Sequence, residues 1–577
     1  MLYFISVWTL LLIGCCSCGF GLLNILEINI PRSHSPFSRL GDRAIVSTWL
    51  GMLAIAITLL ATALFIPLSP LIGGVVFSIF LVISLRSRST RLEIVELYRQ
   101  ISKPQILVYL GVAIALAAFF AQPVRWDDTG LYHYSLVRWF AQFGMVPGLA
   151  LLFPNFGFTS AWFAFAAPLN PDWAIARTIA VTNGFIFLLA VLQLLISCQR
   201  LLRQQARFID IFVAVYYSCI LLLTIGTNLM LIILVSPSTD IPALLLVAIV
   251  TWAMLTIETA PGSDRLTPAR QLVPLVIAVG AVSIKLTTLP LLLVTGLWFI
   301  FRAGFNRNIF QRMGIAAVVS LLLVPFLLSS IVTSGCPIYP SSAFCLNVPW
   351  AVGADRSTAN ATHHWVTWYG KPPAGIAPWL WAFKQWFATT TGNKITVLMS
   401  LISAGCAIYA LKTRSCQRYL GSIGIFVVGI SFFLMTSPLN RFMLPYFLIV
   451  PALAVAIYYG SDVATESLMP PLQASNSIVI LPQKLPIHLP KLVVILPLIV
   501  AAISTVHRVQ TDYSLLILPP ARDLNVTIER QVNDVTYFFP LGSSPRCWTN
   551  ELPCAYHPTK VRLRDPDRGI KAGFIRS

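Results

Sequence analysis

Long apolar runs separated by short basic clusters dominate the chain. Runs close to or above the ~18–20 residues that cross a lipid bilayer recur throughout, for example at 45–66, 174–196, 211–234 and 315–331. The 577 residues are 57% hydrophobic and only 11% charged, whereas about 25% of the residues in soluble domains are charged. The pattern therefore predicts an all-α fold, a polytopic transmembrane helical bundle of about 12–14 spans.

The basic clusters orient these spans, because Lys and Arg near span ends resist translocation and stay cytoplasmic. The clearest clusters are Arg32/Arg39/Arg43, Arg86/Arg88/Arg91/Arg99/Lys103, Arg200/Arg203/Arg207, Arg302/Arg307/Arg312 and Lys412/Arg414/Arg418. If all are cytoplasmic, both termini lie outside and spans are predicted at 2–26, 44–66, 68–85, 105–122, 172–198, 209–235, 241–257, 271–284, 288–302, 313–333, 393–411, 419–437, 442–460 and 491–506. The short pair at 271–302 could be one broken hairpin.

Three sizeable external segments follow from this orientation: 123–171, 334–392 and 507–577. Two cysteine pairs fall in the last two segments, Cys336 with Cys345 and Cys547 with Cys554. Such local pairs form disulfides only in an oxidising compartment, so both disulfides are predicted. Because no cysteine was used to orient the chain, this agreement supports the topology. Three domains are expected: N-terminal helices (1–104), a membrane core (105–506) and an external tail or cap (507–577).

The formal net charge of +19 does not indicate a nucleic-acid partner. The Lys and Arg residues sit between apolar segments rather than in a stripe with interleaved aromatic residues, a pattern typical of topology signals and lipid contact. The sequence has no P-loop, no GxGxxG motif opening a helix, no HExxH motif and no CxxC pair. Cytosolic nucleotide chemistry therefore has no visible site.

The most informative polar segment follows the fourth predicted span. Asp127 and Asp128 precede Tyr132, His133 and Arg138 at helical spacing, a cluster able to take a proton or hold a divalent cation. The alternative is that an Asp only caps an interfacial helix running through Phe140, with Trp126 and Trp139 as anchors at the membrane surface. Both interpretations can hold, because one Asp suffices as a cap.

Asp240, Lys285 and Arg441 interrupt or adjoin other apolar runs. Asp240 either caps a helix or needs hydration or a partner, and Lys285 either snorkels, pairs with a carboxylate or binds an anion such as phosphate. A guanidinium suits bidentate phosphate recognition, although an ion pair with Asp240 or Asp127 would explain Arg441 equally well. The predicted topology puts all of these residues at the external face, as a site for an anionic substrate with a carboxylate base would require.

The external segment 334–392 is rich in aromatic residues. Aromatic faces can stack on sugar rings, but the stretch 376–387 also has the character of an interfacial helix, and a role at the membrane surface is favoured. His363 and His364 are a weak metal signal, because adjacent side chains rarely converge on one ion without further ligands.

A first external loop with two Asp residues soon after a span, followed by an interfacial helix, resembles the GT-C superfamily of membrane glycosyltransferases. The chain as a whole, over about residues 100–577, looks like an uncharacterised bacterial membrane family with GT-C-like architecture. The segments that carry this resemblance are Trp126–Tyr134, Ser236–Pro242, Lys285–Pro290, Ser334–Pro340, Ser437–Phe442 and the Arg546–Cys554 tail.

This resemblance implies a plasma-membrane transferase that uses a polyprenyl-phosphate-linked sugar and a glycan or lipid acceptor outside the cytoplasm. Asp127 or Asp128 would be the general base toward the acceptor hydroxyl, and Arg441, with Lys285, would hold the lipid phosphate. Tyr132, His133 and Asp240 are expected beside them as substrate-binding residues. The spans before residue 105 and the short tail depart from a minimal GT-C core, so acceptor recognition stays unassigned.

Three other functions stay open. A transporter or flippase of a lipid-linked or anionic solute would also use intramembrane charges and a broken hairpin. However, the cytoplasmic half of the predicted spans looks nearly free of charge, which favours a one-sided site. A glycan polymerase or ligase of another fold would need external Arg residues but no Asp in the first loop. For a non-catalytic assembly protein, substitution of Asp127 and Asp128 would be silent.

Overall fold

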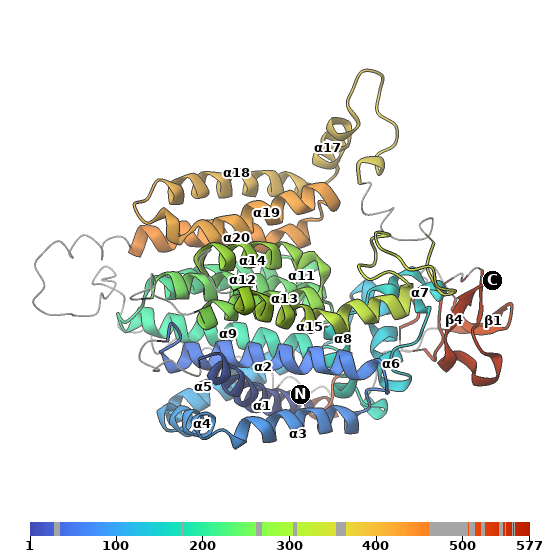
Figure 1. Cartoon of the computed structure of the whole chain (residues 1–577), viewed down its shortest axis with the longest axis horizontal. Helices are drawn as coiled ribbons and strands as arrows, with labels where there is room; N and C mark the ends of the chain where they lie inside the picture. The colour runs from blue at the N-terminus through green and yellow to red at the C-terminus, as the bar shows by residue number, and fades with distance from the viewer. Residues whose placement is uncertain are drawn as a thin grey trace, which may run out of the picture.

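The protein is a bundle of long helices with a small β-structure at one end (Figure 1). The computed structural model describes residues 1–27, 35–174, 177–260, 268–303, 309–353, 365–460, 503, 506, 514–520, 526–541, 546–548, 550–556, 558 and 560–577. Within this part of the chain, eight helices are long and apolar enough to cross a membrane, or up to ten if each bent pair is one span. The predicted multi-pass membrane character is therefore supported. The predicted span at 491–506 lies outside the described residues apart from 503 and 506.

The first half of the chain contains both long and short helices. They are α1 (Leu2–Leu26), α2 (Leu40–Ala63), α3 (Pro70–Arg86), α4 (Arg88–Gln100), α5 (Lys103–Phe120), the π-helix η2 (Thr129–His133), α6 (Tyr134–Gln142), α7 (Leu149–Leu152), α8 (Ala161–Ala166), α9 (Val181–Leu202), α10 (Phe208–Gly226), α11 (Asn228–Leu234), α12 (Asp240–Glu258) and α13 (Pro268–Ile284).

The second half continues the bundle and ends in the β-structure. Its elements are the short 3-10 helix η7 (Leu286–Thr288), α14 (Leu289–Ala303), α15 (Ile309–Ser334), α17 (Pro378–Thr389), α18 (Thr391–Leu411), α19 (Leu420–Thr436), α20 (Asn440–Gly460), α22 (Ser514–Ile517), β1 (Thr527–Val532), β2 (Val535–Pro540), β3 (Val561–Leu563) and β4 (Phe574–Arg576). The helix α17 confirms that the stretch predicted as a helix at 376–387 is helical, to within two residues at each end; its position at a membrane surface stays a prediction.

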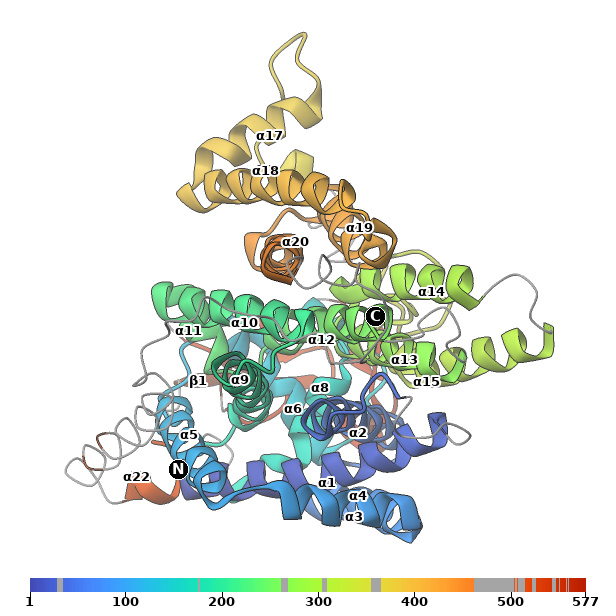
Figure 2. The same cartoon turned by 90° about the vertical axis from the view of Figure 1, so that its left-hand side faces the viewer.

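The central helix of the bundle is α12. Its apolar side chains are buried on all sides, and it packs against α9, α10, α13, α19 and α20. A helix that is apolar around its whole circumference is stable only when surrounded. The N-terminal helices are part of the same assembly, since α1 packs against α2, α9 and α13. Figure 2 shows the helices gathered around α12, with α18 and α17 toward one edge.

Three span predictions need correction. The helix expected from residue 172 begins only at Val181, because Pro171 and the two short turns before it hold the chain outside the span. The segment 209–235 is broken at Thr227, which is extended and follows Gly226, a poor helix former. The basic cluster after α3 is itself a helix, α4, set at 95° to α3.

One end of the bundle, which we call the basic end, collects the predicted cytoplasmic clusters. Arg39 and Arg200 form ion pairs of 2.7–2.8 Å with both Asp42 and Asp210. These contacts join α2, α9 and α10, so basic clusters far apart in the sequence do lie on one side. These charged residues lie at or just beyond the ends of the predicted spans, so the expected lack of charge inside the cytoplasmic half of the spans stays a prediction.

A second group of charges at the basic end is buried more deeply. Arg43 contacts Glu27 at 2.6 Å and Glu93 at 3.0 Å, and only 2% of its side chain is exposed. The side-chain oxygen of Asn24 accepts a further hydrogen bond from Arg43 at 2.8 Å. The cluster therefore joins the end of α1 and the start of α2 to the middle of α4.

The opposite end, the cap end, brings together the three predicted external segments. The backbone N–H of Trp548 donates to Gly130, that of Phe574 to Pro147 and that of Arg576 to Pro349. Strands β1 and β2 form an antiparallel hairpin, and β3 and β4 form a second antiparallel pair. Figure 1 shows β1 and β4 beside α6 and α7 at this end, opposite α4.

Both predicted disulfides are present at the cap end. They join Cys336 to Cys345 and Cys547 to Cys554. The second disulfide closes the short loop that carries Trp548, so this loop is fixed next to η2. The seven remaining cysteines are free.

Candidate functional site

Four charged residues that are distant in sequence meet at the cap end because each lies at a helix boundary. Asp240 is the first residue of α12, Arg441 is the second residue of α20, and Asp128 immediately precedes η2. Lys285 adopts an extended backbone conformation between α13 and η7, with φ −154° and ψ 123°. The short 3-10 helix and Pro290, which stands at the start of α14, turn the chain back there, confirming a hairpin broken at Lys285.

The four residues form a chain of ion pairs, which we call the cap-end cluster. Lys285 pairs directly with Asp240. The Arg441 guanidinium lies 3.5 Å from an Asp128 oxygen and 3.6 Å from the other Asp240 oxygen. Charged hydrogen bonds are typically ~2.7–2.9 Å long, so Arg441 is held by attraction without short hydrogen bonds to either carboxylate. The ion-pair explanation of Arg441 is therefore confirmed for Asp240, whereas Asp128 is found in place of the other predicted partner, Asp127.

Aromatic rings enclose the two cations. The Lys285 ammonium lies 4.2 Å from the centre of the Phe442 ring, and the Arg441 guanidinium lies 5.0 Å from the rings of both Trp126 and Phe442. Such contacts stabilise a cation without neutralising it. Trp126 was expected to be a surface anchor and instead contacts Arg441, while Trp139 is fully buried in the core. The sequence analysis did not predict Phe442 as a site residue, although Phe442 follows Arg441 directly in the sequence.

Asp127 is separate from the cap-end cluster. Its side chain is 56% exposed and pairs at 2.9 Å with Arg546, from the loop before the C-terminal disulfide. Arg138 also turns away: its guanidinium donates to the backbone oxygen of Asn550 at 2.5 Å. Arg546 could not be predicted as a site residue, because its partner Asp127 lies more than 400 residues away in the chain.

The C-terminal loop touches the same segment at a third point. A side chain added at Gly130 would place its Cβ 2.5 Å from the Trp548 ring, and the Trp548 N–H donates to the Gly130 oxygen at 3.0 Å. Only glycine allows this approach. Three contacts therefore fix residues 127–138 against the cap: Asp127 with Arg546, Gly130 with Trp548, and Arg138 with Asn550.

Burial raises the pKa of Asp128 above its ordinary value; Arg441 and Lys285 oppose this rise, and Asp127 adds to it. The helix-cap interpretation finds no support at Asp128, whose side chain makes no capping hydrogen bond to η2. Asp240 likewise follows the cap position of α12 and uses its carboxylate for Lys285 and Arg441. Both carboxylates therefore form ion pairs within the cap-end cluster instead of capping a helix.

His133 and Tyr132 lie against the cluster on its inner side. His133 is 1% exposed, its ring is 4.3 Å from that of Tyr132, and its Nδ1 is 3.4 Å from the Thr129 hydroxyl. Burial, with Lys285 and Arg441 nearby, lowers the pKa of His133 well below its ordinary value. His133 is therefore a buried neighbour of the two cations, and it is not part of the lining of the pocket beside them.

A narrow pocket opens beside the cap-end cluster and has two kinds of wall. Asp240, Lys285 and Arg441 form its charged rim. Its other side is apolar and runs along α12 and α20; the lining there includes Ala243, Leu244, Val247, Phe442 and Pro445. The free volume of about 10 Å³ is that of roughly one water molecule. A ligand with an ionic head and a hydrocarbon chain would find matching chemistry at this rim and wall, but it can enter only if α12 and α20 move apart.

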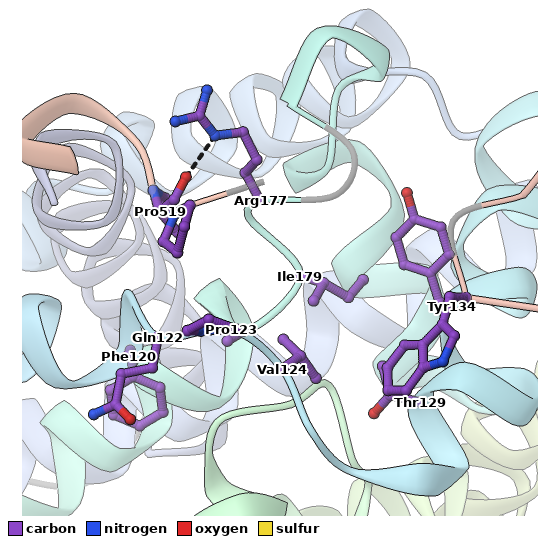
Figure 3. A pocket seen from close by; sticks show the side chains of 12 residues that line it. Phe120, Gln122, Pro123, Val124, Thr129, Tyr134, Arg177, Ile179 and Pro519 are labelled. Carbon is purple, nitrogen blue, oxygen red and sulfur yellow. Dashed lines mark hydrogen bonds between the residues drawn. The ribbon is translucent and has the colours of Figure 1, made fainter. Parts of the chain in front are cut away.

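A second pocket lies on the other flank of residues 129–134 (Figure 3). Arg177 and Tyr134 both line it, and the Arg177 side chain points toward Pro519, donating to its backbone oxygen. The Tyr134 hydroxyl is buried and has no hydrogen-bond partner within the described part of the chain. This pocket has no carboxylate in its lining, so it offers no candidate base.

The sequence left open that the site holds a divalent metal, but the described residues provide no ligand set for one. Within the residues that the structure describes, no group of three or more His, Cys, Asp or Glu residues could hold a metal ion. His363 and His364 lie outside the described residues.

Comparison with known proteins places the chain in a family without assigning an activity. No curated protein and no solved structure matches the chain. The sequence model of the family described as "Domain of unknown function (DUF8201)" matches residues 1–448. This match includes α1–α5 and the four residues of the cap-end cluster, and it ends before the C-terminal cap. The chain belongs to the DUF8201 family.

Proposed function

We propose that the protein is a membrane glycosyltransferase that takes its sugar from a polyprenyl-phosphate donor at the extracytoplasmic face, with a GT-C-like fold. The observation that carries this proposal is the pocket with Asp240, Lys285 and Arg441 at its rim and an apolar wall along α12 and α20. A lipid phosphate presents the matching chemistry, a phosphate head joined to a long apolar chain. The extracytoplasmic assignment rests on the two disulfides at the same end, since disulfides persist in oxidising compartments.

Arg441 is the phosphate ligand in this proposal. Its nitrogen atoms stand 3.5–3.6 Å from the nearest carboxylate oxygens, so a phosphate oxygen can replace these weak contacts with shorter ones. Lys285 is committed to Asp240 and contributes positive potential behind Arg441. As the bond between the anomeric carbon and the phosphate oxygen breaks, the negative charge developing on phosphate is stabilised by these cations.

Asp128 is the proposed base. Its carboxylate lies beside Arg441, and burial raises its pKa, which brings it closer to the acid–base range useful near neutral pH. Asp128 takes the proton of the acceptor hydroxyl while that oxygen bonds to the anomeric carbon, and the lipid phosphate leaves with the bonding electrons. Asp127 is the less favoured base, because it is paired with Arg546 and anchors the cap.

Complementation of a deletion strain tests the proposal. Variants Asp128→Asn, Asp127→Asn and Arg441→Ala would be expressed at equal membrane levels while surface and exported glycans are profiled. We expect Asp128→Asn and Arg441→Ala to lose one glycan that wild type restores, and Asp567→Asn, an exposed carboxylate of the cap, to restore it fully. Wild-type glycans with both site variants would reject a transferase at this cluster and favour transport or assembly.

A further inference from the structure

The helix α4 is attached to the bundle by one face only. On that face Glu93 pairs with the buried Arg43, and the Thr90 hydroxyl accepts a hydrogen bond from Asn24 at 3.3 Å. Both contacts reach the basic ends of α1 and α2. The inner face is therefore specified by buried polar partners, which fix the rotation of α4 about its axis.

The outer face of α4 combines apolar and basic side chains. Leu92, Val95 and Tyr98 are 60%, 45% and 78% exposed. The three exposed arginines on this face are Arg88, Arg91 and Arg99. At ~3.6 residues per turn these side chains share one side of the helix. Of the two acids in α4, Glu93 is turned inward onto Arg43 and Glu96 accepts a hydrogen bond from Gln100. The outer face is therefore strongly basic.

The direction of α4 follows from its connection to α3. The α3 helix presents exposed apolar side chains along its length, among them Leu71, Val75 and Val82, as expected of a helix facing lipid. Arg88 starts α4 one residue after α3 ends, and the two axes meet at 95°. If α3 crosses the bilayer, α4 must lie nearly parallel to the membrane surface. Figure 1 agrees, with α4 viewed almost along its axis at the end of α3 opposite the cap.

We propose that α4 is a binding site for the head groups of anionic phospholipids at the basic end of the protein. Leu92, Val95 and Tyr98 enter the boundary between head groups and acyl chains, while Arg88, Arg91 and Arg99 contact lipid phosphates. Apolar and basic residues interleaved on one face of an interfacial helix are suited to this layer. An acidic protein partner would match the arginines but would leave the three large apolar side chains at lipid depth unexplained. This site is independent of the transferase proposed above.

The test measures lipid preference on the full-length protein. Protein purified in non-ionic detergent and stripped of lipid is titrated with phosphatidylglycerol or phosphatidylcholine, and bound lipids are counted by native mass spectrometry. The wild type should bind phosphatidylglycerol in preference. The triple variant Arg88→Gln/Arg91→Gln/Arg99→Gln should lose roughly 10- to 100-fold of that preference, and the corresponding triple Lys variant should keep most of it.

The matched control removes the same charge from the cap. Arg562→Gln/Arg568→Gln/Lys571→Gln changes three exposed basic residues at the other end of the molecule and should leave the preference unchanged. An unchanged preference in the α4 Gln variant, or an equal loss in the cap control, would overturn the proposal. If the triple Gln variant is not monodisperse, the single variants decide: each should lose part of the preference, and no loss in any of them rejects the site. The triple Gln variant should bind a polyprenyl phosphate with the same affinity as the wild type, which separates this test from that of the transferase.

Discussion

The charges at the two ends of the bundle are arranged in different ways. At the basic end, Arg43 is 2% exposed and contacts its carboxylate partners at 2.6–3.0 Å. At the cap end, Arg441 is 24% exposed and its nearest carboxylate oxygens are 3.5–3.6 Å away. A buried cation whose donors are satisfied holds helices together, whereas a partly exposed cation with more distant partners can exchange them for a ligand. A charged residue therefore indicates a binding site only when its hydrogen-bond donors lack short contacts within the protein.

The largest expected effect is on catalysis at the cap end. Asp128→Asn keeps the shape of the side chain but removes its ability to accept the acceptor proton, so transfer should fall by about 10²–10⁴-fold. The measurement is sugar transfer from a polyprenyl-phosphate donor by purified protein, with Asp567→Asn as the control. Activity within twofold of wild type would remove Asp128 from the mechanism.

The next largest effect is on stability at the basic end. Arg43→Gln leaves Glu27 and Glu93 buried without their cation, which should cost about 3–5 kcal/mol of folding stability. Arg441→Gln, in the looser and more exposed cluster, should cost less than about 1 kcal/mol. Thermal unfolding of both variants in the same detergent checks this difference. Equal loss of stability would show that the two clusters have the same structural role.

A smaller effect is expected where the cap meets η2. Gly130→Ala puts a methyl group 2.5 Å from the Trp548 ring, and such overpacking typically costs ~1–3 kcal/mol. The double variant Gly130→Ala/Trp548→Ala should recover part of this loss. Limited proteolysis of the cap, followed as a double-mutant cycle, measures the coupling. Additive effects of the two substitutions would contradict direct packing.

The smallest effect is a change in pH dependence. The carboxylate of Asp128 must be ionised to act as a base, so activity should fall as pH drops through its raised pKa. Arg441 lowers that pKa, and Arg441→Gln should therefore move the acid limb of the residual activity to higher pH. The pH profile of kcat/KM in wild type and variant tests this. If the acid limb of the profile lies at the same pH in wild type and variant, a group other than Asp128 controls it.

Much of the architecture follows from the sequence because membrane topology depends on local signals. Apolar run length and basic clusters located most spans, and the same topology placed Asp128, Asp240, Lys285 and Arg441 at one end before any contact was known. The α4 helix was not predicted because the basic cluster that includes its three arginines was interpreted only as a topology signal. Its apolar side chains recur at helical spacing, which would have identified it.

Pairing between distant segments could not be predicted in the same way. Nothing local links Arg546 to Asp127, or shows that Glu27 and Glu93 would neutralise Arg43, because these contacts depend on how helix ends meet in three dimensions. Which Asp joins Arg441 was also undetermined, since adjacent residues on a helical turn point in different directions.

Binding of a polyprenyl monophosphate to the purified protein tests the central claim most directly. The claim is that the loosely paired Arg441 receives a lipid phosphate. Wild type and the control Arg568→Gln, an exposed arginine of the cap, should bind the lipid with similar affinity, while Arg441→Gln should bind it at least about tenfold more weakly, as expected when a charged hydrogen bond to a ligand is lost. Equal affinity of wild type and Arg441→Gln would contradict a phosphate site at the cap-end cluster.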